Sequence, residues 1–160
     1  MSSYKEIKPL GSVFDFSRMP SWYIICTNGL CPMQSSCLRY MAASYAPETK
    51  EIATCVMPKA LKEGKCRFYD KRTVVVYAAG FSHLYDRVMK KDYTTMRKTI
   101  TSYLHGAKLY YEYMRGDRPL SPEQQQWIRD YVKNCGYDWE VEFDSYYEGY
   151  AFHHVAQKDG

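Results

Sequence analysis

Residues 26–40 read Cys26-Thr27-Asn28-Gly29-Leu30-Cys31-Pro32-Met33-Gln34-Ser35-Ser36-Cys37-Leu38-Arg39-Tyr40, and Cys55 and Cys66 follow before residue 70. Three cysteines within twelve positions, on a loop broken by Asn28-Gly29 and Pro32, are able to converge on one point, as a metal ion or a cluster requires of thiolates. This stretch predicts a metal site around which the amino-terminal half of the chain folds.

The preferred ligand set is Cys26, Cys31, Cys37 and Cys66. Cys55 lies in Thr54-Cys55-Val56-Met57, which is typical of a strand, so we expect a small buried apolar side chain there, and the sequence does not decide whether it is a ligand. The cofactor is expected to be a zinc ion or an iron–sulfur cluster with a structural role. The chain has no Cys-x-x-Cys pair, which counts against a zinc finger, whereas clusters tolerate looser spacing and a cysteine followed by proline.

Two other interpretations of the cysteines stay open. All five early cysteines are buried free thiols in the first, because cysteine is among the most buried residue types. In the second they form disulfides or act as reactive thiols. Disulfides are disfavoured because the amino terminus has no apolar run of signal-peptide length and no segment is long and apolar enough to span a membrane. We therefore expect a cytoplasmic protein with no membrane partner.

The pattern of apolar residues predicts an α+β fold in a single domain of residues 1–160. A cysteine-bearing subregion with a small sheet (1–91) and a helical subregion with a terminal strand (92–160) meet at a seam near residues 90–94. Strands are expected at Ile52–Met57, Arg72–Ala79 and Trp139–Phe143. Helices are expected at Cys37–Tyr45, from Ser82 to Lys91, from Thr94 or Thr95 to His105, at Ala107–Arg115, and from Ser121, as cap, to Asn134.

The charge is unevenly distributed along the chain. Residues 71–118 hold ten Lys and Arg against four Asp and Glu, whereas residues 119–160 hold three against eight. Residues 94–135 are expected to form three consecutive helices, and the short middle one lies in the basic segment. This is the layout of a helix-turn-helix whose middle helix enters the major groove. The candidate DNA-binding residues are Lys98, Lys108, Tyr110, Tyr111, Arg115 and Arg118. The alternative is a tyrosine-rich helix packed in a protein-interaction module.

Several motifs together resemble an uncharacterised domain-of-unknown-function family of Bacteroidetes proteins. They are Cys26, Cys31-Pro32 and Cys37-Leu38-Arg39, then Tyr110-Tyr111 and Arg115-Gly116-Asp117-Arg118-Pro119-Leu120-Ser121-Pro122-Glu123-Gln124-Gln125, then Cys135-Gly136-Tyr137 and Phe143-Asp144-Ser145-Tyr146. The resemblance covers most of residues 14–150. It implies a bacterial cytosolic protein with recurring early cysteines, and it implies no activity.

Catalytic patterns are absent from the sequence. The four histidines have no cysteine, serine or glutamate at a recognisable catalytic spacing, and there is no glycine-rich phosphate loop. We therefore expect a non-enzymatic protein that combines a Cys-ligated metal site with a helix-turn-helix-like DNA-binding segment. The alternative is a metal-stapled protein–protein interaction module with no nucleic-acid role.

Overall fold

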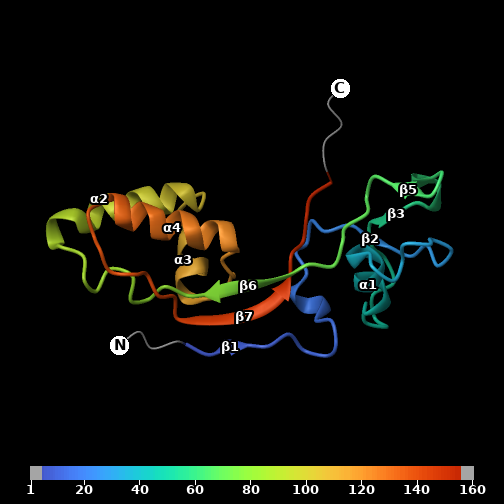
Figure 1. Cartoon of the computed structure of the whole chain (residues 1–160), viewed down its shortest axis with the longest axis horizontal. Helices are drawn as coiled ribbons and strands as arrows, with labels where there is room; N and C mark the ends of the chain where they lie inside the picture. The colour runs from blue at the N-terminus through green and yellow to red at the C-terminus, as the bar shows by residue number, and fades with distance from the viewer. Residues whose placement is uncertain (1–4, 156–160) are drawn as a thin grey trace, which may run out of the picture. The chain divides into compact units, whose positions relative to one another are not determined.

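A computed structural model describes residues 5–155 of the chain, which form two compact units (Figure 1). The first, the helical unit, comprises residues 5–10 and 75–149; the second, the cysteine unit, comprises residues 11–74 and 150–155. Helices and small sheets together confirm the predicted α+β class. The seam expected near residues 90–94 lies inside the helical unit.

The sheet of the helical unit has three strands, in the order β1-β7-β6. They are β1 (Ile7–Lys8), β6 (Val74–Ala79) and β7 (Ser145–Tyr150). β1 runs parallel to β7, with Ile7 opposite Tyr146, and Figure 1 shows β6 and β7 running in opposite directions. The helices α2 (Lys90–Tyr103), α3 (Ala107–Arg115) and α4 (Pro122–Asn134) gather on one side of these two strands.

The buried core of the helical unit joins its helices to its sheet and to the irregular segments between them. Its members are Ala78, Phe81, Leu84, Met96, Ile100, Leu104, Tyr110, Leu120, Ile128, Val132, Val141 and Phe143. Met96, Ile100 and Leu104 are four residues apart, so they form one stripe along α2 and just beyond its end, as amphipathic periodicity requires. The Tyr103 ring stacks on Trp127 of α4 at 3.7 Å between centroids.

Two of the helices match their sequence predictions to the residue. α3 spans Ala107–Arg115 and ends at Gly116, whose φ of 87° is left-handed, a conformation that glycine adopts without strain. α4 begins after Ser121, whose hydroxyl accepts a hydrogen bond from the Gln124 N–H, and the Gln124 side chain returns to the Ser121 N–H. These local hydrogen bonds confirm the predicted capping box.

Three predictions for the helical unit are wrong. The helix expected from Ser82 does not form; consecutive turns occupy this region, and α2 begins at Lys90, ahead of the expected caps Thr94 and Thr95. The Ser82 N–H donates to the Asp144 carboxylate, a partner 62 positions away, so Ser82 is held in a tertiary contact instead of capping a helix. Trp139–Phe143 alternates in burial but belongs to no strand.

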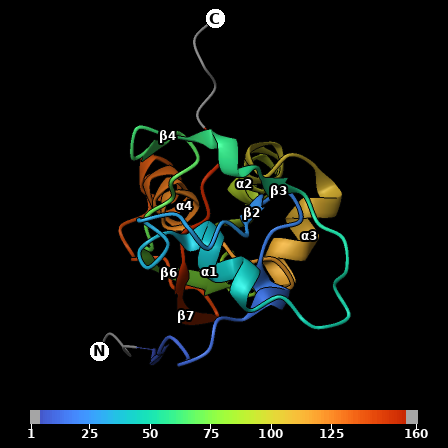
Figure 2. The same ribbon diagram turned by 90° about the vertical axis from the view of Figure 1, so that its right-hand side faces the viewer.

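The cysteine unit has one α-helix, α1 (Leu38–Ser44), two 3-10 turns, η1 (Phe16–Arg18) and η2 (Pro58–Ala60), and two-residue strands. β2 (Ile25–Cys26) pairs in parallel with β3 (Cys55–Val56), and β4 (Leu61–Lys62) forms an antiparallel hairpin with β5 (Lys65–Cys66). In Figure 2 long irregular connections run between these elements. The predicted helix at Cys37–Tyr45 is confirmed with Cys37 as its N-cap, whereas the strand expected at Ile52–Met57 shortens to β3 and that at Arg72–Ala79 to β6.

A small core holds the cysteine unit together. The buried members are Phe14, Tyr23, Ile25, Leu38, Met41 and Ala42. This core is small, and the unit has little regular secondary structure. Units of this size commonly need a metal or disulfides in addition to apolar burial.

Candidate functional site

The four cysteines predicted as metal ligands line one cavity of the cysteine unit. Cys26 comes from β2, Cys31 from the loop that follows, Cys37 from the N-cap of α1, and Cys66 from β5. The cavity holds about 20 Å³, room for a single water molecule or ion. All six cysteines are free thiols, and Cys55 is outside this lining, with its Sγ donating weakly to the Ala53 carbonyl at 3.6 Å.

Local hydrogen bonds explain why three of these cysteines converge. The Asn28 side chain accepts from the Leu30 N–H at 3.2 Å and its carbonyl accepts from the Cys31 N–H at 3.2 Å, which folds the loop after Cys26 back on itself. A further turn links the Cys37 N–H to the Met33 carbonyl at 3.1 Å. Cys37 then pairs with Lys71 in an isolated β-bridge.

The surroundings of Cys26 favour the protonated form of its thiol. Burial raises the pKa of the Cys26 thiol, and ionisation of Cys37, Cys31 or Cys66 would raise it further, although a hydrogen bond from the Asn28 N–H lowers it. Without a cation this thiol stays protonated at neutral pH. A bound metal ion would reverse the balance, because it stabilises the deprotonated form of each ligand.

Two arginines bring positive charge to the same region. Arg39, 3% exposed, lines the cavity and donates to the carbonyls of Ile24 at 2.7 Å and Phe68 at 2.7 Å. Arg72 donates through Nη2 to the carbonyl of Gln34, another lining residue, and its buried Nε has no hydrogen-bond partner.

The thiol groups are gathered but not yet arranged as ligands. Among residues 5–155 no group of three or more His, Cys, Asp or Glu side chains has a geometry that would hold a metal ion. The donor set and the space therefore fit a metal, whereas coordination would require the thiols to move closer together.

A buried polar network connects α1 to Tyr23, Asp70 and His153. Asp70, 6% exposed, accepts hydrogen bonds from the Tyr23 hydroxyl at 2.7 Å and the His153 N–H at 3.3 Å. Arg39 stacks on the Tyr23 ring and donates to the His153 carbonyl at 2.9 Å. Burial, followed by the hydrogen bond to Asp70, raises the pKa of Tyr23, so its hydroxyl remains a donor. Sequence reasoning missed this network because its members have no common spacing.

The candidate DNA-binding residues all lie on or just after α2 and α3 of the helical unit, but in different environments. Lys98 on α2 and Lys108 and Tyr111 on α3 are exposed. Lys108, Tyr111 and Arg115 share one face of α3 because they are three and four residues apart. The expectation for Tyr110 is corrected: only 2% of it is exposed, because its ring packs against Phe81 in the core, so it is not available to stack on a base.

The two arginines of the candidate set form ion pairs. Arg115 contacts Asp117 at 3.1 Å, and Arg118 contacts Glu112 at 3.0 Å. The Arg115–Asp117 pair is solvent-exposed and the Arg118–Glu112 pair is partly so, and exposed ion pairs contribute little to stability. The surface around α3 is consequently less positive than the count of Lys and Arg in the sequence suggests.

Comparison with known proteins places the chain in one family. The family model described as "Family of unknown function (DUF6078)" matches residues 10–152. Neither a curated protein nor a solved structure matches the chain. In the part of the chain that the structure describes, no helix combines the length and the apolar character needed to cross a bilayer. Because the family model covers most of the sequence, the chain belongs to the DUF6078 family of unknown function.

Proposed function

We propose that the protein is a non-enzymatic binding module whose cysteine unit is stapled by one structural zinc ion on Cys26, Cys31, Cys37 and Cys66. The observation that supports the proposal is the shared cavity, since residues up to forty positions apart bring four thiols to one small space. Coordination would supply folding free energy to a unit with a small core. A reducing compartment such as the cytoplasm would keep the thiols available.

Metal analysis of freshly purified, anaerobically handled protein tests this proposal. One equivalent of zinc per chain is expected, and serine in place of Cys31 or Cys66 should abolish it. Cys55→Ser is the matched control, because this thiol belongs to the same unit but lies outside the cavity lining. Iron with sulfide would keep the cysteine ligands and replace zinc by a cluster. A metal-free protein that is fully folded would refute the proposal.

The second candidate function is binding of duplex DNA by the exposed face of α2 and α3. It is supported by Lys98 and Lys108, which are exposed and form no ion pair among the described residues. Arg115 and Arg118 would add phosphate contacts if they exchanged their carboxylate partners for DNA. Four such contacts predict a log–log salt slope of roughly −3 to −4.

Titration of random duplex DNA at several salt concentrations tests this candidate. Lys108→Ala should make the slope less steep by about one, whereas Lys133→Ala on α4 should leave it unchanged. Absence of binding at micromolar protein in low salt would remove the DNA role. The protein–protein interaction module would then be the remaining function, with Tyr111 as its test position.

A further inference from the structure

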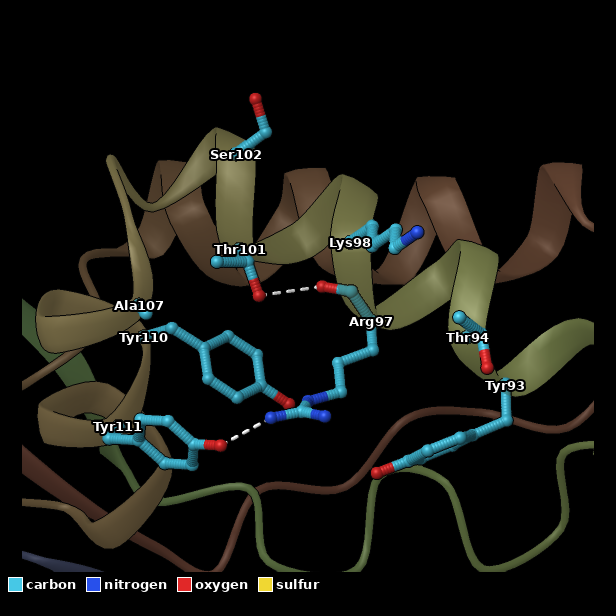
Figure 3. A pocket seen from close by; sticks show the side chains of 9 residues that line it. All are labelled: Tyr93, Thr94, Arg97, Lys98, Thr101, Ser102, Ala107, Tyr110 and Tyr111. Carbon is cyan, nitrogen blue, oxygen red and sulfur yellow. Dashed lines mark hydrogen bonds between the residues drawn. The ribbon is translucent and has the colours of Figure 1, made fainter.

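A cavity of the helical unit lies between α2 and α3. It encloses about 380 Å³, within the range of small-molecule pockets. Its lining is formed by Tyr93, Thr94, Arg97, Lys98, Thr101, Ser102, Ala107, Tyr110 and Tyr111 (Figure 3). Every lining residue belongs to one unit, and neither the metal proposal nor the cysteine pocket involves it.

Arg97 is the central charged group of this pocket. Figure 3 shows its side chain extending from α2 toward Tyr111, whose hydroxyl accepts a hydrogen bond from the guanidinium. The guanidinium carbon lies 5.7 Å from the Tyr111 ring centroid and 6.0 Å from that of Tyr110. Among the described residues Arg97 forms no ion pair with a carboxylate, and neither does the adjacent Lys98. Two positive charges therefore line the pocket without a matched anion.

The aromatic walls of the pocket differ in their freedom to move. Tyr110 is fixed, since its hydroxyl donates to the Tyr85 hydroxyl at 3.0 Å and its ring is in the core. Tyr93 and Tyr111 are 40% and 37% exposed, so each keeps a free ring surface. The pocket thus combines a rigid floor, two accessible aromatic rings and two cations.

We propose that the pocket between α2 and α3 binds a small phosphate monoester with a planar aromatic body. The phosphate binds Arg97, and the Lys98 side chain, which points away from the guanidinium in Figure 3, turns toward the phosphate. The planar body lies against Tyr93 or Tyr111. A phosphate monoester carries nearly two negative charges at neutral pH, which matches the two cations. A guanidinium group can donate two parallel hydrogen bonds to two oxygens of one phosphate, and planar rings stack favourably on tyrosine. In the complex, the guanidinium N–H that now donates to the Tyr111 hydroxyl donates to a phosphate oxygen instead. The inference goes beyond the zinc staple and does not depend on it.

Isothermal titration of the 160-residue chain with adenosine 5′-monophosphate tests the proposal. The expected dissociation constant is on the order of 10–100 μM. Adenosine, which lacks the phosphate, and inorganic phosphate, which lacks the planar body, should each bind at least about tenfold more weakly. No binding of the nucleotide at millimolar concentration would overturn the proposal, as would inorganic phosphate binding as tightly as the nucleotide.

Variants separate the pocket from nonspecific charge attraction. Arg97→Met should weaken nucleotide binding by about tenfold or more, because it removes a charged phosphate contact and keeps an unbranched apolar stem at this position. Lys98→Met, at an exposed position, should weaken it as well. Lys133→Met on α4 removes the same charge outside the pocket and should leave binding unchanged. Binding that Arg97→Met and Lys98→Met leave intact, or that Lys133→Met reduces equally, would overturn the assignment.

Discussion

Gly80 links the end of β6 to the turn that replaces the expected helix. Its φ is 84°, and a Cβ built at this position would lie 2.5 Å from Oδ2 of Asp144. The Gly80 carbonyl accepts the Asp144 N–H at 2.8 Å, and the Asp144 carboxylate in turn accepts the Ser82 N–H. No larger residue fits here without moving a carboxylate that holds the turn.

Gly80→Ala is therefore expected to destabilise the protein by about 2–4 kcal/mol, since it combines a strained φ with a steric clash. Gly136→Ala is the matched control, because Gly136 has a φ of 97° and nothing within 4 Å of the added Cβ. It should cost only about 1 kcal/mol. Urea unfolding followed by circular dichroism measures both, and equal losses would show that the contact with Asp144 does not matter.

Tyr77 on β6 makes the stability of the helical unit depend on pH in the alkaline range. Burial, followed by the charges of Tyr147 and Glu123, raises its pKa to about 12 from an ordinary value of 10.0. A raised pKa means that the folded state holds the proton more tightly, so stability present below pH 10 is lost as the pH rises toward 12. Tyr77→Phe should lose less stability than the wild-type protein between these values. Urea midpoints at pH 9 and pH 11 check this, and parallel losses in both proteins would contradict it.

At the scale of elements, α3 and α4 follow local rules, whereas the strands and the region between Ser82 and Met89 do not. α4 is defined by residues within its own first turn. Trp139–Phe143 has the alternation of a strand, but its backbone is satisfied by side chains: the Phe143 N–H donates to the Tyr146 hydroxyl at 3.1 Å, and the Val141 carbonyl accepts from Arg129 at 3.4 Å. Alternation of apolar and polar residues indicates which side of a segment is buried. A strand also requires hydrogen bonds to a partner strand.

The capping box of α4 leads to a prediction. Ser121→Ala removes the hydroxyl that accepts the Gln124 N–H and should lower the free energy of unfolding by about 1 kcal/mol. Ser121→Thr keeps an accepting hydroxyl and should restore most of the loss. Ser102→Ala removes an exposed hydroxyl from α2 and serves as the control for the loss of a serine. If Ser121→Ala and Ser102→Ala unfold at the same urea concentration, the cap does not stabilise α4.

On the scale of the whole molecule, the two units have different sources of stability. The helical unit has three helices on a sheet and twelve buried core residues, whereas the cysteine unit has six buried core residues and a polar network around Arg39 and Asp70. If a bound zinc ion stabilises the cysteine unit, removal of the zinc should lower the stability of that unit first.

Hydrogen exchange measured by mass spectrometry, before and after treatment with a zinc chelator, tests this expectation. Protection of amides in α1 and β2 should fall by at least about tenfold, whereas α4 should keep its protection. Cys31→Ser without chelator should reproduce the effect, and Cys55→Ser should not. Uniform loss of protection in both units, or no loss in either, would show that metal does not stabilise the cysteine unit selectively.

The sequence by itself determined the α+β class, the bounds of α3 and α4, the position of α1, and the set of four cysteines that line one cavity. Apart from the approach of Cys66 to the other three cysteines, these features depend on residues close together in the chain, such as caps, glycine stops and the turns after Cys26, whose hydrogen bonds form within a few positions.

Only the tertiary structure decided the strand pairing of β1 with β7, the burial of Tyr110, the ion pairs of Arg115 and Arg118, and the pocket around Arg97. Tyr93, Arg97 and Thr101 share one face of α2 at four-residue spacing, a signal that sequence reasoning lost by beginning this helix at Thr94 or Thr95. The other features join distant residues, as when Lys5 donates to the Phe143 carbonyl across 138 positions. Such contacts depend on which surfaces meet when the chain folds. A local sequence pattern does not specify which distant residue a given side chain will contact.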